Sequence, residues 1–219
     1  MQLLRSVGLL IRKELILEWR QRYAISGILL FVLATVFVVF FAAVDPRREV
    51  WNALFWIIVL FASINAVVKS FVQESGHRQL YYYSLLDPVA VLLSKIIYNT
   101  LLLFVISLLA WAAFAFISEN PVKETGQFVV LLFLGALGLS VTLTFTSAIA
   151  AKADNTATLL AILGLPLILP VLLSLVKLSA NALRLITDTG YLTDIYMLIA
   201  IDLVLLGMGL LLFPFLWRD

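Results

Sequence analysis

The sequence predicts an all-α polytopic membrane protein with six transmembrane helices, an N-terminal interfacial amphipathic helix and a polar cytoplasmic segment between the second and third spans. Of the 219 residues, 63% are hydrophobic and only 13% are charged, whereas a soluble domain is about half apolar and a quarter charged. The apolar residues gather in six stretches of spanning length. The lysines and arginines lie mostly on one side of those stretches.

We expect a single transmembrane domain over residues 1–219, because a span needs about 20 apolar residues and six stretches meet that length. The breaks between them carry turn chemistry, in which an Asp or Asn before a Pro caps the helix that follows. The spans are predicted at residues 23–44, 50–68, 89–117, 127–151, 156–176 and 195–217.

The basic residues predict that both termini are cytoplasmic. With that orientation, ten of the fifteen lysines and arginines lie on the cytoplasmic side, where loops carry an excess of positive charge. The net charge of +2, without a basic run, gives no sign of nucleic-acid binding. The absence of cysteine from the sequence excludes disulfides and thiolate chemistry.

Residues 1–22 are predicted to form a helix along the cytoplasmic interface of the bilayer. Apolar side chains recur there at helical spacing, at Leu4, Val7, Ile11 and Leu15. Arg5, Arg12 and Glu18 fall elsewhere on the helical wheel, as in a helix that lies on a membrane surface. The alternative is a basic tail that only directs insertion.

Residues 69–88 are too polar to span and too patterned for a plain linker. Gly76 interrupts the segment, and a polar group surrounds it, made of Glu74, Ser75, His77 and Arg78. A short cytoplasmic helix that contacts a soluble partner would have this pattern. The alternative is an ordinary interfacial loop.

No catalytic motif is present in the sequence. It has no phosphate-binding G-x-x-x-x-G-K-[ST] loop, no G-x-S-x-G and no H-E-x-x-H. His77 has no second histidine or cysteine with which to share a metal. We therefore expect a non-enzymatic chain without a bound metal or cofactor.

Few polar residues fall inside the spans. Asp202 lies about 7 residues, or roughly 10 Å, into the last span, and an intramembrane carboxylate is by default a functional-site hypothesis because its burial is costly. The alternative is a hydrogen-bonded carboxyl inside the helix packing. Asn65, Asn99 and Lys95 lie near cytoplasmic ends, where we expect them to snorkel.

Two spans have unusual composition. The fourth is rich in glycine and hydroxyl residues, which allow close helix contact and predict a packing span within the subunit or between two copies. The fifth contains Pro166 and Pro170, each of which removes a backbone donor. We expect that span to be kinked or broken there.

These features together resemble the membrane subunits of ABC-2 type exporters. Two stretches, "FVQESGHRQLYYYSLLDPVAVLLSK" and "LGLPLILPVL", resemble the CcmB family, the haem exporter B proteins of cytochrome c maturation. The resemblance covers nearly the whole chain in length and span order. Asp87 stands where the family usually has a serine before Pro88, and Gln79 where it has an acidic residue.

The resemblance implies a permease subunit of the inner membrane that couples a separate ATPase to haem export or to release of the haem chaperone CcmE. Its implied partners are a CcmA-like cytoplasmic ATPase, CcmC- and CcmD-like haem-handling proteins, the lipid bilayer and a second copy of the chain. Haem is then the cargo of the complex. The residues implied in ATPase docking are Glu74, Gly76, His77, Arg78, Asp87 and Pro88.

Three other functions compete with this interpretation. The first is an ABC-2 permease for another cargo, such as a lipid, glycan or drug. A secondary transporter would show internal repeats and several ionisable groups at the membrane midplane. The sequence shows no clear repeat, and Asp202 is its only ionisable candidate at that depth. An intramembrane enzyme would need a nucleophile and a base within the spans, and the sequence offers no such pair.

Overall fold

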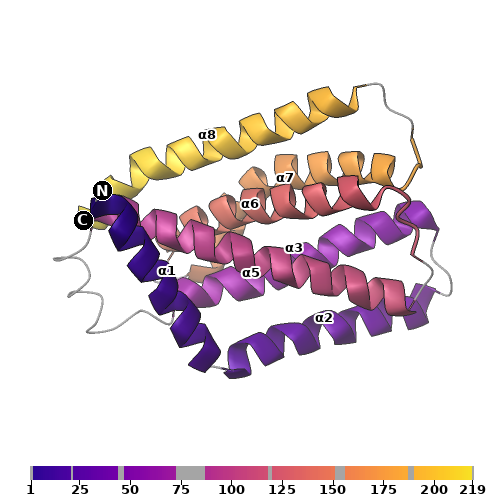
Figure 1. The fold of residues 1–219 in the computed structure, drawn as a ribbon, viewed down its shortest axis with the longest axis horizontal. Helices are drawn as coiled ribbons and strands as arrows, with labels where there is room; N and C mark the ends of the chain where they lie inside the picture. The colour runs from indigo at the N-terminus through magenta and orange to yellow at the C-terminus, as the bar shows by residue number, and fades with distance from the viewer. Residues whose placement is uncertain are drawn as a thin grey trace.

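The chain folds as a helical bundle (Figure 1), described here from a computed structural model that covers residues 2–20, 22–43, 47–72, 87–117, 120–150, 156–186 and 190–218. Within these residues the regular structure consists of seven helices and no strand. The helices are α1 (Gln2–Arg20), α2 (Arg22–Ala43), α3 (Arg48–Val72), α5 (Pro88–Ile117), α6 (Thr125–Ala150), α7 (Thr156–Ala182) and α8 (Tyr191–Arg218).

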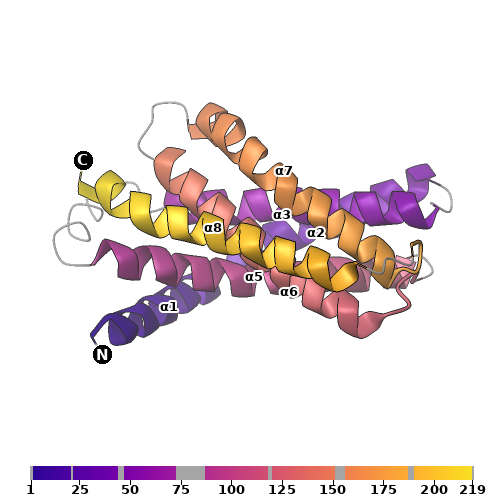
Figure 2. The same cartoon turned by 90° about the horizontal axis from the view of Figure 1, so that it is seen from above.

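The other six described helices run along the long axis of the molecule, and α1 crosses them at one end (Figures 1 and 2). The beginning of α1 and the end of α8 lie at this same end, which we call the proximal end. The opposite end, where α3 begins and α7 ends, is the distal end. Helix α6 lies at the centre of the bundle and packs against α3, α5, α7 and α8.

The composition of α6 explains its central position. The glycine and hydroxyl side chains that set the predicted fourth span apart are buried, among them Gly135, Gly138, Ser140, Thr142, Thr144, Thr146 and Ser147. At Gly135 an added Cβ would lie 2.9 Å from the Trp56 ring of α3 and 3.0 Å from Leu175 of α7. Small residues therefore let three helices approach one another, which confirms the predicted packing span within the subunit.

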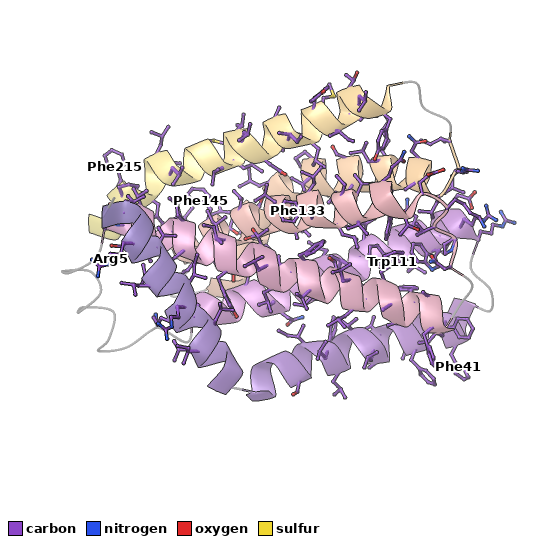
Figure 3. All side chains as sticks on the ribbon, in the orientation of Figure 1. Arg5, Phe41, Trp111, Phe133, Phe145 and Phe215 are labelled. Carbon is purple, nitrogen blue, oxygen red and sulfur yellow. The ribbon has the colours of Figure 1, made fainter. Side chains whose placement is uncertain are left out.

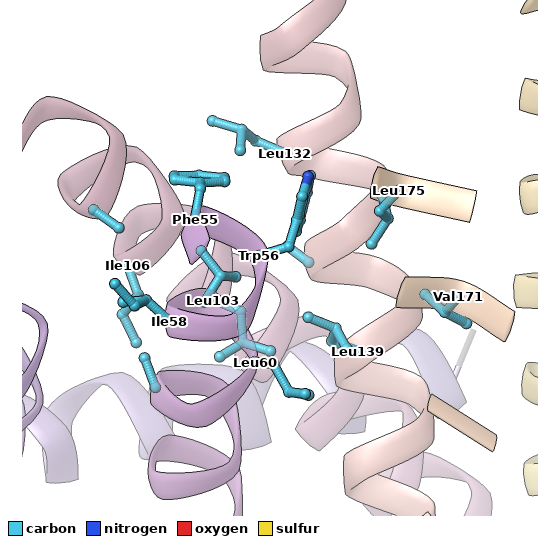
Figure 4. Close-up of a cluster of buried hydrophobic side chains, with 14 of the residues drawn as sticks. Phe55, Trp56, Ile58, Leu60, Leu103, Ile106, Leu132, Leu139, Val171 and Leu175 are labelled. Atoms are coloured by element: carbon cyan, nitrogen blue, oxygen red, sulfur yellow. The ribbon is translucent and has the colours of Figure 1, made fainter. Parts of the chain in front are cut away.

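The core and the outer surface are both apolar, as expected of a protein whose solvent is lipid. Phe55 and Trp56 of α3 pack with Leu132 and Leu139 of α6 and Leu175 of α7 in a fully buried cluster (Figure 4). Large apolar side chains also cover the outside of the bundle, such as Phe41 and Phe215 (Figure 3). A soluble monomer rarely exposes so much apolar surface.

Five helices are long and apolar enough to cross a bilayer, namely α3, α5, α6, α7 and α8. Helix α2 contributes a shorter apolar stretch, Ser26–Ala42, so the sixth span stays a prediction. The helices extend past the predicted ends of several spans. Helix α7 continues from residue 176 to Ala182, and α8 begins at Tyr191 rather than at residue 195. Each span was predicted to end where the apolar residues end. The helix itself continues beyond that point until its last backbone groups are capped.

Candidate functional site

Most of the predicted docking segment lies outside the described residues. This applies to Glu74, Gly76, His77 and Arg78. The first four residues of the segment, 69–72, belong to α3, so the part between the two helices is shorter than the sequence predicted.

Asp87 and Pro88 form the start of α5. The Asp87 carboxylate accepts a hydrogen bond from the backbone N–H of Val89 at 3.0 Å, and its carbonyl accepts one from Val91 at 3.1 Å. Asp87 is therefore the N-cap, and Pro88 occupies the first helical position, where its missing N–H costs nothing. These contacts hold the first turn of α5 where the predicted docking segment ends.

Lys95 is buried rather than snorkelling. Its side chain is 3% exposed on the face of α5 that α1 covers, and its Nζ lies 3.9 Å from the carboxylate of Glu14 on α1. Glu14 also pairs with Lys13 at 3.2 Å. The expectation of a snorkelling Lys95 was wrong because α1 packs on α5 and brings a partner to the ammonium group, so that it has no need to reach the interface.

Asn99 is likewise buried, at the seam between α5 and α6. Its amide donates to the Thr144 hydroxyl at 2.9 Å, and the Ser140 hydroxyl donates to the Ile96 carbonyl at 2.8 Å. These bonds hold two apolar helices in register. Asn65, by contrast, is exposed and donates to the carbonyl of Phe61 at 2.9 Å on its own helix.

Asp202 lies on α8 where that helix contacts α6. Its side chain is only 3% exposed, and among the described residues no hydrogen-bond donor reaches either carboxylate oxygen. The carboxyl group faces Gly138, because a Cβ built at Gly138 would overlap Oδ1 of Asp202 and lie 2.9 Å from Val171 of α7. The glycine thus supplies the space in which the carboxyl group fits.

Pro166 and Pro170 lie inside one helix. Helix α7 is continuous from Thr156 to Ala182 and contains both prolines. The span is therefore not broken, and the expected kink stays a prediction. Both prolines are exposed, on the outside of the bundle. The Ser174 hydroxyl donates to the carbonyl of Pro170 at 2.8 Å. The prolines are not brought to Asp202 by any described contact.

A polar network at the distal end was missed by the sequence analysis. The Trp56 indole N–H donates to the Ser179 hydroxyl at 2.8 Å, and the Ser179 hydroxyl donates to Oδ1 of Asn52 at 2.7 Å. The Asn52 amide donates to the Val176 carbonyl at 2.9 Å. These residues stand 123 to 127 positions apart, and each alone resembles an ordinary span-end residue, so no sequence pattern joined them.

Metal or cofactor ligands do not gather in the described part of the chain. No group of three His, Cys, Asp or Glu residues there could hold a metal ion, and the single histidine, His77, lies outside it. In the described residues, the candidate site consists of contacts between helices. It has one unpaired carboxyl group in the middle of the bundle and one capped helix start at the proximal end.

Comparison with known proteins completes this description. The family profile described as CcmB protein matches residues 5–216. The chain belongs to the CcmB family. No curated protein matches it in sequence. Membership of the CcmB family makes the chain an integral membrane, permease-type subunit of the Ccm haem-export ABC system, which serves cytochrome c maturation.

Proposed function

We propose that this chain couples a separate CcmA-like ATPase to haem export, or to release of the haem chaperone, and is not itself catalytic. The family match over residues 5–216 is the observation that carries the proposal. The sequence has no phosphate-binding loop, and work from ATP therefore has to enter through a contact with another subunit.

The contact we propose is the segment 69–88, with Glu74, Gly76, His77, Arg78, Asp87 and Pro88 as its docking residues. Helix α3 leads into this segment and α5 leaves it, so both helices are directly connected to whatever binds there. The Asp87 cap holds the first turn of α5, and α5 packs against α1 and the central α6. A displacement at Pro88 would thus be passed to the centre of the bundle.

We further propose six spans in the inner membrane, cytoplasmic termini and two copies of the chain in a complex with CcmC- and CcmD-like proteins. The shared position of the beginning of α1 and the end of α8 supports the orientation (Figure 1), together with the excess of Lys and Arg on that side. Two copies would match the two ATPase sites that an ABC exporter uses.

The decisive experiment is co-purification of the ATPase with charge-reversal variants. A charged side chain desolvated at a protein contact contributes more than a solvated one, so Glu74→Lys should lower the amount of bound ATPase about tenfold or more. Glu49→Lys is the matched control, because Glu49 is exposed in the first turn of α3 at the distal end. Both variants should insert and purify in normal amounts.

Two results would count against the docking assignment. If Glu74→Lys retains the ATPase as firmly as the parent chain, Glu74 is a solvated residue. If deletion of residues 75–81 also leaves the complex intact, the ATPase binds elsewhere, and α1 becomes the better candidate.

A further inference from the structure

Asp202 is placed where a charged carboxylate is least stable. It is the twelfth of the 28 residues of α8, about 16 Å along the helix from Tyr191. Its side chain is 3% exposed, and no described donor reaches its oxygens. A buried carboxylate needs either a cation or several hydrogen-bond donors to offset the loss of water.

The helices around Asp202 offer no free cation for it. Helix α6 carries no charged residue between Thr125 and Ala150. On α7 the only charged side chain is Lys177, which pairs with Asp194 at 2.5 Å, and Asp194 lies eight residues, or about 12 Å, before Asp202 along α8. On α5, Lys95 is 3.9 Å from Glu14. The other titratable groups on these helices are the phenols of Tyr98, Tyr191 and Tyr196 and, at the far end of α8, Arg218.

The hydroxyl groups on the facing part of α6 are also engaged. Thr142 donates to the carbonyl of Gly138 at 2.9 Å, and Thr146 donates to the carbonyl of Thr142 at 2.8 Å. Each hydroxyl has a single proton to donate, so neither can donate to Asp202 without breaking its present bond. The carboxyl group therefore packs on a part of α6 whose Thr142 and Thr146 hydroxyls are both engaged.

We propose that Asp202 is a proton-binding site within the membrane. The carboxyl group holds its proton while α8 packs against Gly138. When α8 moves away from α6 and water reaches the group, the O–H bond breaks, the proton passes to water and a carboxylate remains. Separation of these two helices is thereby linked to proton release, and their return to proton uptake.

Infrared spectroscopy of the full chain in lipid nanodiscs at neutral pH tests this proposal. The wild-type chain should show the carbonyl band of a protonated carboxylic acid, and Asp202→Asn should lose it. Asp194→Asn is the matched control, because Asp194 lies on the same helix but pairs with Lys177, and this variant should keep the band. Absence of the band from the wild-type chain, or its persistence in Asp202→Asn, would overturn the proposal.

A second arm covers the case in which Asp202→Asn does not fold. In wild-type chain labelled with ¹³C at the aspartate side-chain carboxyl, the band should shift to lower frequency. In Asp202→Glu with the same label, the band should stay at its unlabelled frequency, since the protonated group is then a glutamate. A band that does not shift in the labelled wild type, or that shifts in Asp202→Glu, belongs to another residue and refutes the assignment.

Discussion

Two buried polar regions of this bundle are built in opposite ways. At the distal end, Trp56, Ser179 and Asn52 satisfy one another and the α7 backbone through three bonds of 2.7 to 2.9 Å. In the middle of the bundle, Asp202 packs against Gly138 with no described donor to either carboxylate oxygen. Both regions are almost fully removed from solvent, with Asn52 2% and Asp202 3% exposed.

The difference separates a structural role from a functional one. A satisfied network of neutral groups fixes helix positions and has no state to change. A buried ionisable group without donors changes its charge when its surroundings open, so it is sensitive to the movement of the helix beside it. We therefore expect the distal network to hold α3 against α7 in every state, and the α6–α8 contact to be where the bundle responds.

The largest effect should come from filling the space that Asp202 uses. In Gly138→Ala the new methyl group would overlap Oδ1 of Asp202 and lie 2.9 Å from Val171, and both are short side chains that cannot swing away. Overpacking of this kind costs about 1–3 kcal/mol, partly offset by up to about 1 kcal/mol of helix propensity. Because the methyl group meets two neighbours at once, the cost should lie near the upper end of that range, and thermal unfolding of the chain in detergent should show a net loss of about 2 kcal/mol.

Gly207 provides the control for this variant. It lies on α8, and a Cβ there would meet nothing within 4 Å, so Gly207→Ala should leave stability unchanged or raise it by up to about 1 kcal/mol. Adding Asp202→Ala to Gly138→Ala should recover most of the loss, since the two sites then no longer collide. Additive effects of the two changes would mean that the carboxyl group does not pack on Gly138.

The second effect tests the distal network. Ser179→Ala removes the acceptor of the Trp56 N–H and the donor to Asn52, and leaves two buried polar groups without partners. Within a membrane protein this should cost about 1–2 kcal/mol. Ser174→Ala on the same helix removes only a bond to the Pro170 carbonyl and should change stability by less than about 0.5 kcal/mol. Equal effects of the two variants would show that the network contributes nothing beyond a local bond.

The sequence predicted where the helices lie better than it predicted which helices contact one another. Apolar length and the Asp87 cap located α5 to within one residue of its observed start, because both signals are local. The end of α7 was missed because Lys177 interrupts the apolar run, although the backbone continues to Ala182. Polarity marks where a helix meets water, and capping marks where it ends, and the two coincide only when the cap is close to the interface.

The candidate site shows the same limit more strongly. The position of Asp202 in the last span was enough to single it out, since a carboxylate is rare at that depth. Its contact with Gly138, 64 residues away, depends on how α6 and α8 pack, and no local pattern records that. Lys95 and Asn99 were expected to snorkel because of their depth along the third span. Depth does not show which face of a helix is covered by another helix, and both side chains are buried against one.

The smallest expected effect concerns the loop that closes the distal end. Arg184 follows α7 with a φ of 55°, and the bonds from Arg184 N–H to Asn181 and from Leu185 N–H to Ala180, both 2.9 Å, form the helix-ending motif that usually contains glycine. Its guanidinium pairs with Glu124 at 2.5 Å, but both side chains are exposed. Arg184→Gly should therefore relieve about 1 kcal/mol of backbone strain and lose an ion pair that contributes about 0–1 kcal/mol, for a net change near zero.

Arg184→Ala separates these two contributions, because it keeps the strained backbone and loses the ion pair. It should be less stable than both the wild-type chain and Arg184→Gly in thermal unfolding. Salt screens an exposed ion pair, so the difference between wild type and Arg184→Ala should shrink at high ionic strength, while the difference between Gly and Ala should not. If Arg184→Gly is no more stable than Arg184→Ala, the backbone at this position carries no strain. A Gly–Ala difference that shrinks with salt would mean that charge, and not backbone geometry, sets the stability of this loop.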